Sequence, residues 1–399
     1  MNASAKSENL PLPAPRRASH LAWCMSLVPD PRVERTRKHL LCDILVAAVC
    51  AVLCGHDSFC DMEEFARSHL AWLRLYVPLA NGVPSHDTFR RVLSLVEPRH
   101  FLRAFRLWTE GLRRSGGQIA IDGKASRRAR NAGERVPYLV NAWSASNRLM
   151  LGGERVSGKE NEIAAIPRVL GWLDIRGALV SADAIACQKK IAALVRRKGG
   201  DYLLALKDNH SVFRDEMQRW IEGVPLRGDG TAVDTFETRE RAHGRDEWRR
   251  CRLVERPAGF DSAEGWQDLA CIALVETRRS VGGKPGKIEK RLYICSRDMS
   301  ARDMLAAVRA HWGIESAHWV LDVVFGEDYS RARTGHAMEN LSLVRRLAAN
   351  MLNLERDAAP EGAPRQRHKS LRRRADRDDA FRTRLLLHPL DGKEVFAVA

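Results

Sequence analysis

The sequence predicts an α/β protein in which helices flank a mixed sheet. A helical N-terminal domain precedes this core, and a strand-rich insertion precedes its last helix. Three observations lead to this prediction. Apolar residues recur at helical spacing up to about residue 115, and short apolar runs then begin at residue 119, first as strands alone and later alternating with helical segments. An irregular strand-rich stretch then separates these runs from a final amphipathic segment.

Length and charge limit the possible functions. A chain of 399 residues can hold one large domain with extensions, or two to three modules. Lys and Arg number 66 against 50 Asp and Glu, so the formal net charge is +16 and a polyanionic partner is expected. Charge alone leaves DNA, RNA and an anionic membrane open. The longest apolar stretch near the N-terminus, Ile44 to Leu53, is too short to span a bilayer and lacks a cleavage signal, so we expect a soluble cytoplasmic protein without a membrane partner.

The first part of the chain is predicted to be helical after a disordered arm. Residues 1–18 are rich in Pro, Ser, Ala and Arg without apolar periodicity, as in disordered segments. Residues 40–53, 60–76 and 101–114 have helical patterns, and Ser85 or Asp87 can cap a further helix that turns Phe89 inward. We therefore expect a helical domain over residues 19–115.

The sheet is predicted from nine apolar runs. Five belong to the core and four to an insertion at about residues 211–297, with helices expected at 161–173, 183–198, from Ser300 to Glu315, and at 338–354. A core domain is expected over residues 116–355, followed by a basic tail at 356–399. The predicted core strands are 119–121, 138–145, 149–152, 178–182 and 202–206, and those of the insertion are 236–241, 249–254, 269–275 and 291–295.

The cysteines and glycine-rich turns exclude two kinds of site. Nine scattered cysteines form no Cys-x-x-Cys pair, so they are better explained as small buried hydrophobic residues than as zinc ligands. The glycines that begin at Gly282 lack the spacing of a phosphate-binding loop and predict a hairpin. No nucleotide cofactor is expected.

Acidic residues at strand ends suggest a metal site. Asp122 closes the first core strand, Asp183 closes a later one, and Glu315 shares a helix face with His311, His318 and Asp322. Such acids suit Mg²⁺, which prefers oxygen ligands. An Asp at a strand end is more often a turn residue, and a polar helix face is usually a solvated one. Spacing alone leaves both interpretations open.

Nine short motifs occur in order between about Pro29 and Leu387. They begin at Pro29, Gly82, Ile121, Glu160, Ala182, Gly200, His243, His311 and His318, and include Ile121-Asp-Gly-Lys124, His311-Trp-Gly-Ile-Glu315 and His318-Trp-Val-Leu-Asp322. These motifs resemble those of the H-repeat-associated insertion-sequence transposases, a group of bacterial DDE transposases. The resemblance implies an RNase H-like catalytic domain over residues 116–355, in which Asp122, Asp183 and Glu315 are catalytic and bind two Mg²⁺ ions, for which Mn²⁺ can substitute. It also implies a DNA-binding or associated role for the helical domain at residues 19–115.

The same resemblance implies a function and its partners. The expected protein is a DNA transposase that cuts at the ends of an insertion sequence and joins the 3′-hydroxyl ends to target DNA by two-metal phosphoryl transfer. Its partners would be the terminal inverted repeats, the target DNA and a second copy of the chain in a homodimer, and it would lie at the nucleoid when bound to DNA. The alternatives are a catalytically degenerate DNA-binding descendant and a stand-alone RNase H-like nuclease.

Basic residues are candidates for contacts to DNA phosphates, with ordinary surface charge as the alternative. These candidates are Lys124, Lys189, Lys190, His311, Arg345, Arg346, Arg372, Arg373 and Arg374.

The sequence departs from the family pattern beside the proposed catalytic glutamate. The family usually has one more residue between this Glu and the His-Trp pair, so Glu315 is followed by a single-residue deletion. One residue corresponds to about 100° of rotation on a helix. His318 and Asp322 still fall near the Glu315 face, whereas Trp319 must repack. The deletion makes an inactive copy an alternative to an active enzyme.

Overall fold

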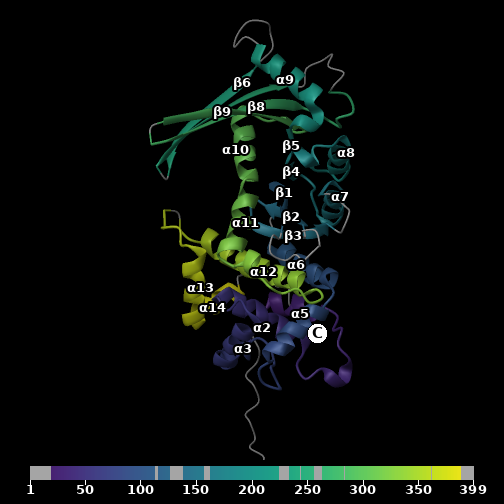
Figure 1. Cartoon of the computed structure of the whole chain (residues 1–399), viewed down its shortest axis with the longest axis vertical. Coiled ribbons are helices and arrows are strands. Elements are labelled where there is room, and N and C mark those ends of the chain that lie inside the picture. Colours follow the sequence, from purple (N-terminus) through teal and green to yellow (C-terminus); the bar gives the residue numbers. More distant parts are fainter. Residues whose placement is uncertain are drawn as a thin grey trace, which may run out of the picture. The chain divides into compact units, whose positions relative to one another are not determined.

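The computed structural model describes residues 19–112, 116–125, 138–156, 162–223, 233–242, 244–255, 263–282, 284–360 and 362–387. These residues form two compact units, each described by itself below (Figure 1). The helical unit contains the described residues up to Gly111 and from Ala332 onward, and the sheet unit contains those between Leu112 and Arg331. The predicted arm at residues 1–18 lies outside the described residues.

The helical unit is built around α2 (Leu41–Cys54), in which every side chain except Cys42 is buried. A helix that is apolar all round must be enclosed by others, and α2 packs against α1, α3, α12 and α13. The cap predicted at Ser85 is confirmed, because its hydroxyl accepts a hydrogen bond from the backbone N–H of Thr88. The other elements of this unit are α1 (His20–Ser26), η1 (Glu34–Thr36), α3 (Phe59–Ser68), α4 (Leu70–Leu73), α5 (His86–Leu95), α6 (Pro98–Leu112), α12 (Ala337–Asp357), α13 (His368–Arg377) and α14 (Asp379–Leu386).

The last three helices lie in the helical unit, and α12 also falls within residues 116–355, which the sequence analysis expects as the catalytic domain. Where the sequence analysis expects a basic tail, the structure has α13 and α14. These two helices form because apolar positions recur at helical spacing among the arginines. Leu371 and Ala375 of α13 and Phe381 and Leu385 of α14 are all buried. These side chains fix α13 and α14 beside α12. The many arginines of this segment hid the amphipathic pattern of both helices in the sequence analysis.

None of the described helices is by itself both long and apolar enough to cross a bilayer. Only α2 and α3, taken as a pair bent by 95°, satisfy the length and composition test.

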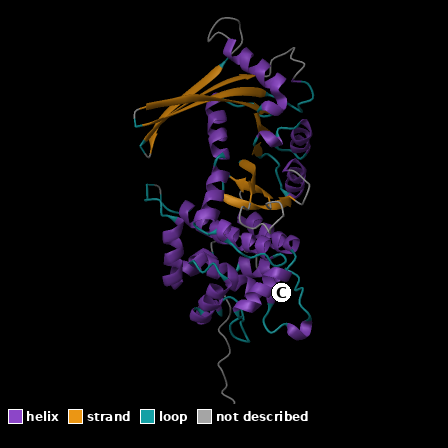
Figure 2. Ribbon diagram, in the orientation of Figure 1, coloured by secondary structure: helices purple, strands orange, loops and turns teal. Residues whose placement is uncertain are grey.

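The sheet unit contains one nine-stranded mixed sheet in the order β3-β2-β1-β4-β5-β9-β8-β7-β6 (Figure 2). β1, β2 and β3 are antiparallel neighbours, β4 and β5 run parallel to β1, and β9 returns antiparallel beside β5. The predicted mixed sheet and its nine strands are confirmed. The strands are β1 (Gln118–Ala125), β2 (Tyr138–Ser144), β3 (Leu149–Val156), β4 (Leu179–Ala182), β5 (Asp201–Leu206), β6 (Asp234–Ala242), β7 (Arg245–Glu255), β8 (Cys271–Val281) and β9 (Lys284–Cys295).

Helices connect and cover the strands of this unit. α7 (Glu162–Trp172) lies between β3 and β4, and α8 (Lys189–Arg197) is the crossover between the parallel strands β4 and β5. α9 (Ser211–Gly223) lies over one face of the β6–β9 portion and α10 (Ala301–His311) lies against the other (Figure 1). The short helices are η2 (Ala184–Ala186), η3 (Asp208–His210) and η5 (Glu327–Tyr329).

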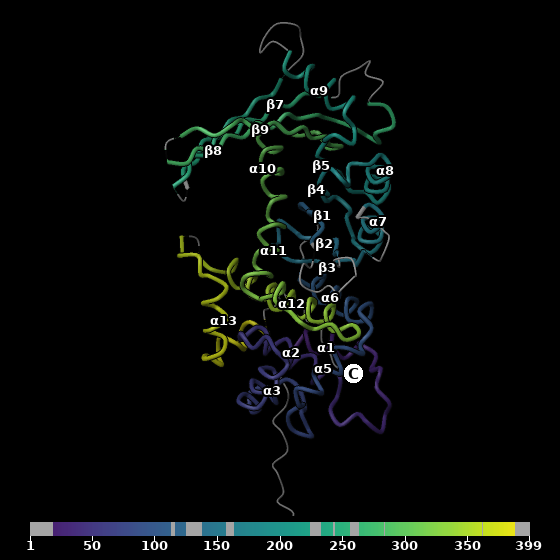
Figure 3. Tube along the Cα trace, viewed as in Figure 1, coloured from purple at the N-terminus to yellow at the C-terminus, as the bar shows by residue number. Residues whose placement is uncertain are grey.

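The segment expected to form one helix up to Glu315 is divided in two. α10 ends at His311, and α11 (Gly313–Val323) begins after Trp312 (Figure 3). Glycine is a poor helix former, and the space at Gly313 is limited, because a Cβ there would lie 3.0 Å from Nε1 of Trp143. The division separates His311 on α10 from Glu315 and His318 on α11.

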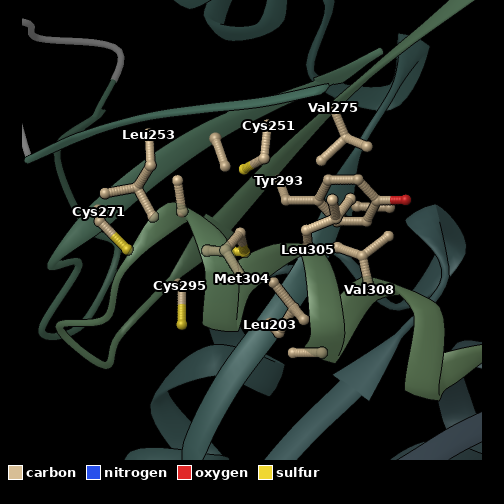
Figure 4. Close-up of a cluster of buried hydrophobic side chains, with 14 of the residues drawn as sticks. Leu203, Cys251, Leu253, Cys271, Val275, Tyr293, Cys295, Met304, Leu305 and Val308 are labelled. Atoms are coloured by element: carbon tan, nitrogen blue, oxygen red, sulfur yellow. The ribbon is translucent and has the colours of Figure 1, made fainter. Parts of the chain in front are cut away.

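A buried core attaches α10 to the β7–β9 strands (Figure 4). Leu305 and Val308 of α10 pack with Tyr293 and with Cys251 and Cys295, which supports the prediction that the cysteines act as small core residues. All nine cysteines are free, and seven of them are buried. This packing fixes the orientation of α10 and therefore the position at which α11 begins.

Candidate active site

Two aspartates meet where neighbouring parallel strands carry them. β1 and β4 pair with Ile121 opposite Ala182, so the next residues, Asp122 and Asp183, lie side by side. Asp122 continues β1, whereas Asp183 follows β4 in an extended conformation and precedes η2. The parallel register therefore brings together two acids that are distant in the sequence.

The surroundings of Asp122 disfavour the ionised form of its carboxyl group. Its pKa is raised from 3.8 to about 6, chiefly because burial disfavours the charged form and because the negative charge of Asp183 lies nearby. Glu315 acts in the same direction, whereas His311 and the backbone N–H of Gly123 oppose the shift. A bound cation would relieve this repulsion, as expected for a metal ligand.

Asp183 is more exposed and is oriented by His311. Nε2 of His311 lies 3.6 Å from Oδ1 of Asp183. This contact, despite partial burial, holds the pKa of Asp183 below its ordinary value, and the positive charges of Lys207 and Arg291 contribute. Nδ1 of His311 lies 3.0 Å from Oγ of Ser181, so the imidazole bridges the end of β4 and the residue that follows it.

Glu315 lies in the first turn of α11 and is exposed. Together with Asp183 and His311 it lines a cleft of about 650 Å³. Among the described residues no three His, Cys, Asp or Glu side chains are close enough to form a ready-made metal site. The donor chemistry nevertheless fits Mg²⁺, since Mg²⁺ prefers carboxylate oxygens and the charges of Asp183 and Glu315 add to an unrelieved electrostatic penalty at Asp122.

A second set of contacts, which the sequence analysis did not identify, holds α11 against the sheet. Nδ1 of His318 lies 3.7 Å from Oδ2 of Asp122, and its Nε2 lies 3.2 Å from Nδ2 of Asn141. Nζ of Lys124 lies 2.5 Å from Oδ1 of Asp322 and 2.5 Å from Oε2 of Glu327. Residues far apart in sequence form these pairs, and the only sequence signal was the shared helix face of His318 and Asp322.

Lys124 was expected to contact phosphates, but the structure places it inside the protein. Its side chain is 7% exposed and is paired with two carboxylates. Three arginines of the helical unit are also buried instead of lying at the surface: Arg345, Arg346 and Arg372. Arg372 donates hydrogen bonds to the carbonyl of Val52 and to Asp57, so its charge is satisfied within the fold.

The remaining candidates for phosphate contact differ in exposure. Lys189 and Lys190 are exposed in the first turn of α8, and Arg373 and Arg374 are exposed on α13. Arg374 lies 4.3 Å from the ring centre of Phe381. These four residues are accessible to a polyanion, whereas His311 belongs to the acid cluster described above.

Comparisons with known proteins agree with this arrangement. Residues 114–351 match the family described as "Transposase DDE domain", and residues 23–109 match the family described as "DDE_Tnp_1-associated". The chain is 37% identical to the "Putative transposase YncI" of Escherichia coli O157:H7 over 86% of this chain and 90% of that protein. It is 35% identical to the "H repeat-associated putative transposase YhhI" of Escherichia coli K12 over 82% and 89%.

A shorter relative is the "Inactive transposase YbfQ" of Escherichia coli K12, 41% identical over 18% of this chain and 83% of that protein. The family match spans more than half of the chain and includes Asp122, Asp183 and Glu315. The chain therefore belongs to the DDE transposase family, in the group that contains the H repeat-associated proteins.

Proposed function

We propose that this protein is a DNA transposase that cuts at the ends of its insertion sequence and joins the freed 3′-hydroxyls to target DNA. The observation that carries the proposal is the parallel pairing of β1 and β4, which sets Asp122 beside Asp183 within a chain of this family. The mixed sheet with its helical crossover also supports an RNase H-like core. Net charge of +16 favours a nucleic-acid substrate.

The proposed reaction exchanges phosphodiester bonds. In cutting, a water oxygen bonds to phosphorus and the bond from phosphorus to the 3′ oxygen breaks, which leaves a 3′-hydroxyl. In joining, that hydroxyl bonds to a target phosphorus and displaces the target's own 3′ oxygen, which takes up a proton. Because one ester replaces another, no nucleotide cofactor is needed for joining.

Asp122, Asp183 and Glu315 would hold two Mg²⁺ ions, with Mn²⁺ as a substitute. The chemistry supplied by the bound ions is activation of the attacking hydroxyl and stabilisation of the leaving oxygen. The chain's own contribution is positional. His311 orients Asp183, His318 contacts Asp122, and Lys124 anchors the end of α11 through Asp322. We also propose a homodimer, because two element ends must be joined, and we propose that it acts in the cytoplasm.

A degenerate DNA-binding protein is the second candidate. The spacing of Glu315 and His318 favours it, because the resemblance implies that the family usually has one more residue between them. Among the described residues no ready-made metal cluster includes Glu315. In this case the chain would bind DNA through its basic surfaces without cutting it.

The test compares wild type with Asp122→Asn, Asp183→Asn and Glu315→Gln. Cleavage and strand transfer are measured in Mg²⁺ on labelled DNA that carries the sequences flanking the gene, and DNA affinity is measured in parallel. We expect each substitution to abolish both reactions while sparing affinity. Asp174→Asn, an exposed acid outside the cluster, is the matched control and should remain active. Normal strand transfer by Asp122→Asn would refute its assignment, and a wild type that binds but never cuts would favour the degenerate protein.

A further inference from the structure

The cleft beside Asp183 and Glu315 has surfaces that the proposed reaction does not use. It lies between the ends of β4 and β5, on one side, and β9 with α10, on the other. Its apolar lining includes Leu203, Ala205 and Val308. Charged side chains line much of the remainder, so the cleft combines an apolar floor, formed by these buried side chains, with a rim rich in charge.

The rim carries more positive than negative charge once the metal-binding acids are set aside. Five cationic side chains, Lys207, Arg214, Lys287, Lys290 and Arg291, stand against the acids Asp208 and Glu289.

Three of these cations have acidic partners. Arg214 pairs with Asp208 and Asp215, and Nζ of Lys290 lies 2.7 Å from Oε1 of Glu222. Arg291 lies 3.4 Å from Glu289.

Lys207 and Lys287 differ from the other three. Both are exposed, and within the described part of the chain neither side chain makes an ion pair or a hydrogen bond. Lys207 directly follows β5, close enough to Asp183 to lower the pKa of that carboxyl. The two ammonium groups therefore supply positive charge without an ion-pair partner at the cleft, and that of Lys207 lies near Asp183 of the proposed reaction centre.

Arg291 is held in place at the same rim. Its guanidinium lies 5.3 Å from the ring centre of Trp312, and that of Arg279 lies 5.6 Å from the same centre. These contacts join β8 and β9 of the insertion to the residue between α10 and α11. The rim is thus attached to the helix that carries Glu315.

The size of the cleft limits its ligand. Pockets that enclose small molecules have volumes of roughly 300–1,000 Å³, and this cleft of about 650 Å³ falls within that range. Such a volume admits one or two nucleotides but not a duplex. An unpaired nucleotide offers an apolar base and an anionic phosphate, which match the apolar floor and the cationic rim.

We propose that this cleft binds a short unpaired stretch of the DNA strand next to the cut, with Lys207 and Lys287 contacting its phosphates and the apolar floor contacting a base. The proposal rests on the proposed function only in taking DNA as the substrate. It implies that the duplex opens locally beside the cut before the strand enters. Lys207 and Lys287 are then positioning residues for the substrate strand.

The first test is binding without divalent ions, so that no cutting is required. The probes are a short fluorescein-labelled oligothymidylate and a labelled duplex of equal length, and affinity is measured by fluorescence anisotropy in EDTA across a range of salt. The variant is Lys207→Met/Lys287→Met. Lys284→Met is the matched control, because this exposed lysine also lies on β9 but does not line the cleft.

We expect the double variant to bind oligothymidylate about tenfold more weakly. The slope of log K against log salt should fall by about 1.4, since each phosphate contact on a single strand contributes about 0.7. Its affinity for the duplex and the behaviour of Lys284→Met should stay near those of wild type. Unchanged oligothymidylate binding would overturn the proposal, and so would an equal loss on both probes, which would indicate a general phosphate contact.

A second test measures the local opening of the duplex directly. 2-Aminopurine is placed beside the cut in the flanking-sequence duplex, and its fluorescence is followed on binding to Asp122→Asn protein. Asp122→Asn with intact lysines should raise the fluorescence, whereas the same protein with Lys207→Met/Lys287→Met should not. No rise in either protein would refute local opening. Because neither test needs cleavage, a failure of the cleft proposal is distinguishable from a failure of the proposed transposase activity.

Discussion

Replacing Asp122 with Asn should stabilise the metal-free protein while it abolishes activity. The structure gives the reason, because burial and the neighbouring Asp183 raise the pKa of Asp122 from 3.8 to about 6. An ionised carboxylate at this position is therefore a cost to folding. The neutral amide has a similar shape and avoids that cost.

The size of the effect follows from the pKa. Each pH unit of difference between folded and unfolded pKa values corresponds to about 1.4 kcal/mol, so the change from 3.8 to about 6 corresponds to about 3 kcal/mol. For a domain of this size, each kcal/mol changes the Tm by roughly 2–4 °C. Asp122→Asn should then raise the Tm of the sheet unit by roughly 6–12 °C, measured well above pH 6.

The pH dependence has a definite sign. A folded pKa above the unfolded one means that the folded state binds the proton more tightly, so wild-type stability falls as the pH rises from 3.8 to beyond 6. The full penalty is present above 6 and absent below 3.8. Asp122→Asn lacks this titration, so its stabilising effect should disappear at the acidic end of the range.

The assay is thermal and chemical unfolding in EDTA across this pH range. Asp183→Asn is the matched control with the opposite expectation. Because His311 holds the pKa of Asp183 below its ordinary value, losing that carboxylate should lower stability above pH 4. Added Mg²⁺ should raise the Tm of wild type more than that of Asp122→Asn. A neutral or destabilising effect of Asp122→Asn above pH 6 would show that its carboxylate is not in a repulsive environment.

Three further predictions concern the helix α11 and the basic residues. Inserting one alanine after Glu315 rotates its carboxylate by about 100° relative to the rest of α11, so DNA cleavage should fall. A gain in cleavage would instead identify a degenerate chain that the insertion repairs. Lys124→Met should lower the free energy of unfolding by about 3–5 kcal/mol, because it removes the buried ammonium that pairs with the carboxylates of Asp322 and Glu327. Exposed Lys190→Met should change it by less than about 0.5 kcal/mol in urea unfolding. Arg373→Ala should reduce the slope of log K against log salt for duplex binding by about 0.9, with little change in stability, because Arg373 is exposed. Arg372→Ala should instead destabilise the protein, because Arg372 is buried. The reverse result would contradict these exposures.

The strands and the meeting of the two aspartates were predictable from local patterns. Each of the strands β1 to β5 contains a short apolar run, and parallel neighbours end at one edge of a sheet. Once β1 and β4 are taken as parallel neighbours, the positions of Asp122 and Asp183 follow from their places at the ends of apolar runs. Local sequence sufficed here because the decisive geometry is that of strands.

The burial of the basic residues was not predictable in the same way. Arg372 and Lys124 resemble surface cations in the sequence, because nothing nearby reveals Asp57 or Glu327 as a partner. Long side chains with apolar stems also pack in interiors when such partners exist. The division at Trp312 depended on another distant contact, that of Gly313 with Trp143.

The position of Glu315 depends on contacts at both ends of α11. At the start, Gly313 lies against Trp143 of β2, and at the end, Asp322 pairs with Lys124 of β1. The resemblance to the family implies one residue fewer between these contacts, and the fixed ends limit where such a difference can be absorbed. The sheet holds Asp122 and Asp183 independently of that length. We therefore expect the shortening to act on the direction of the Glu315 carboxylate, so that catalytic competence depends on this proposed ligand.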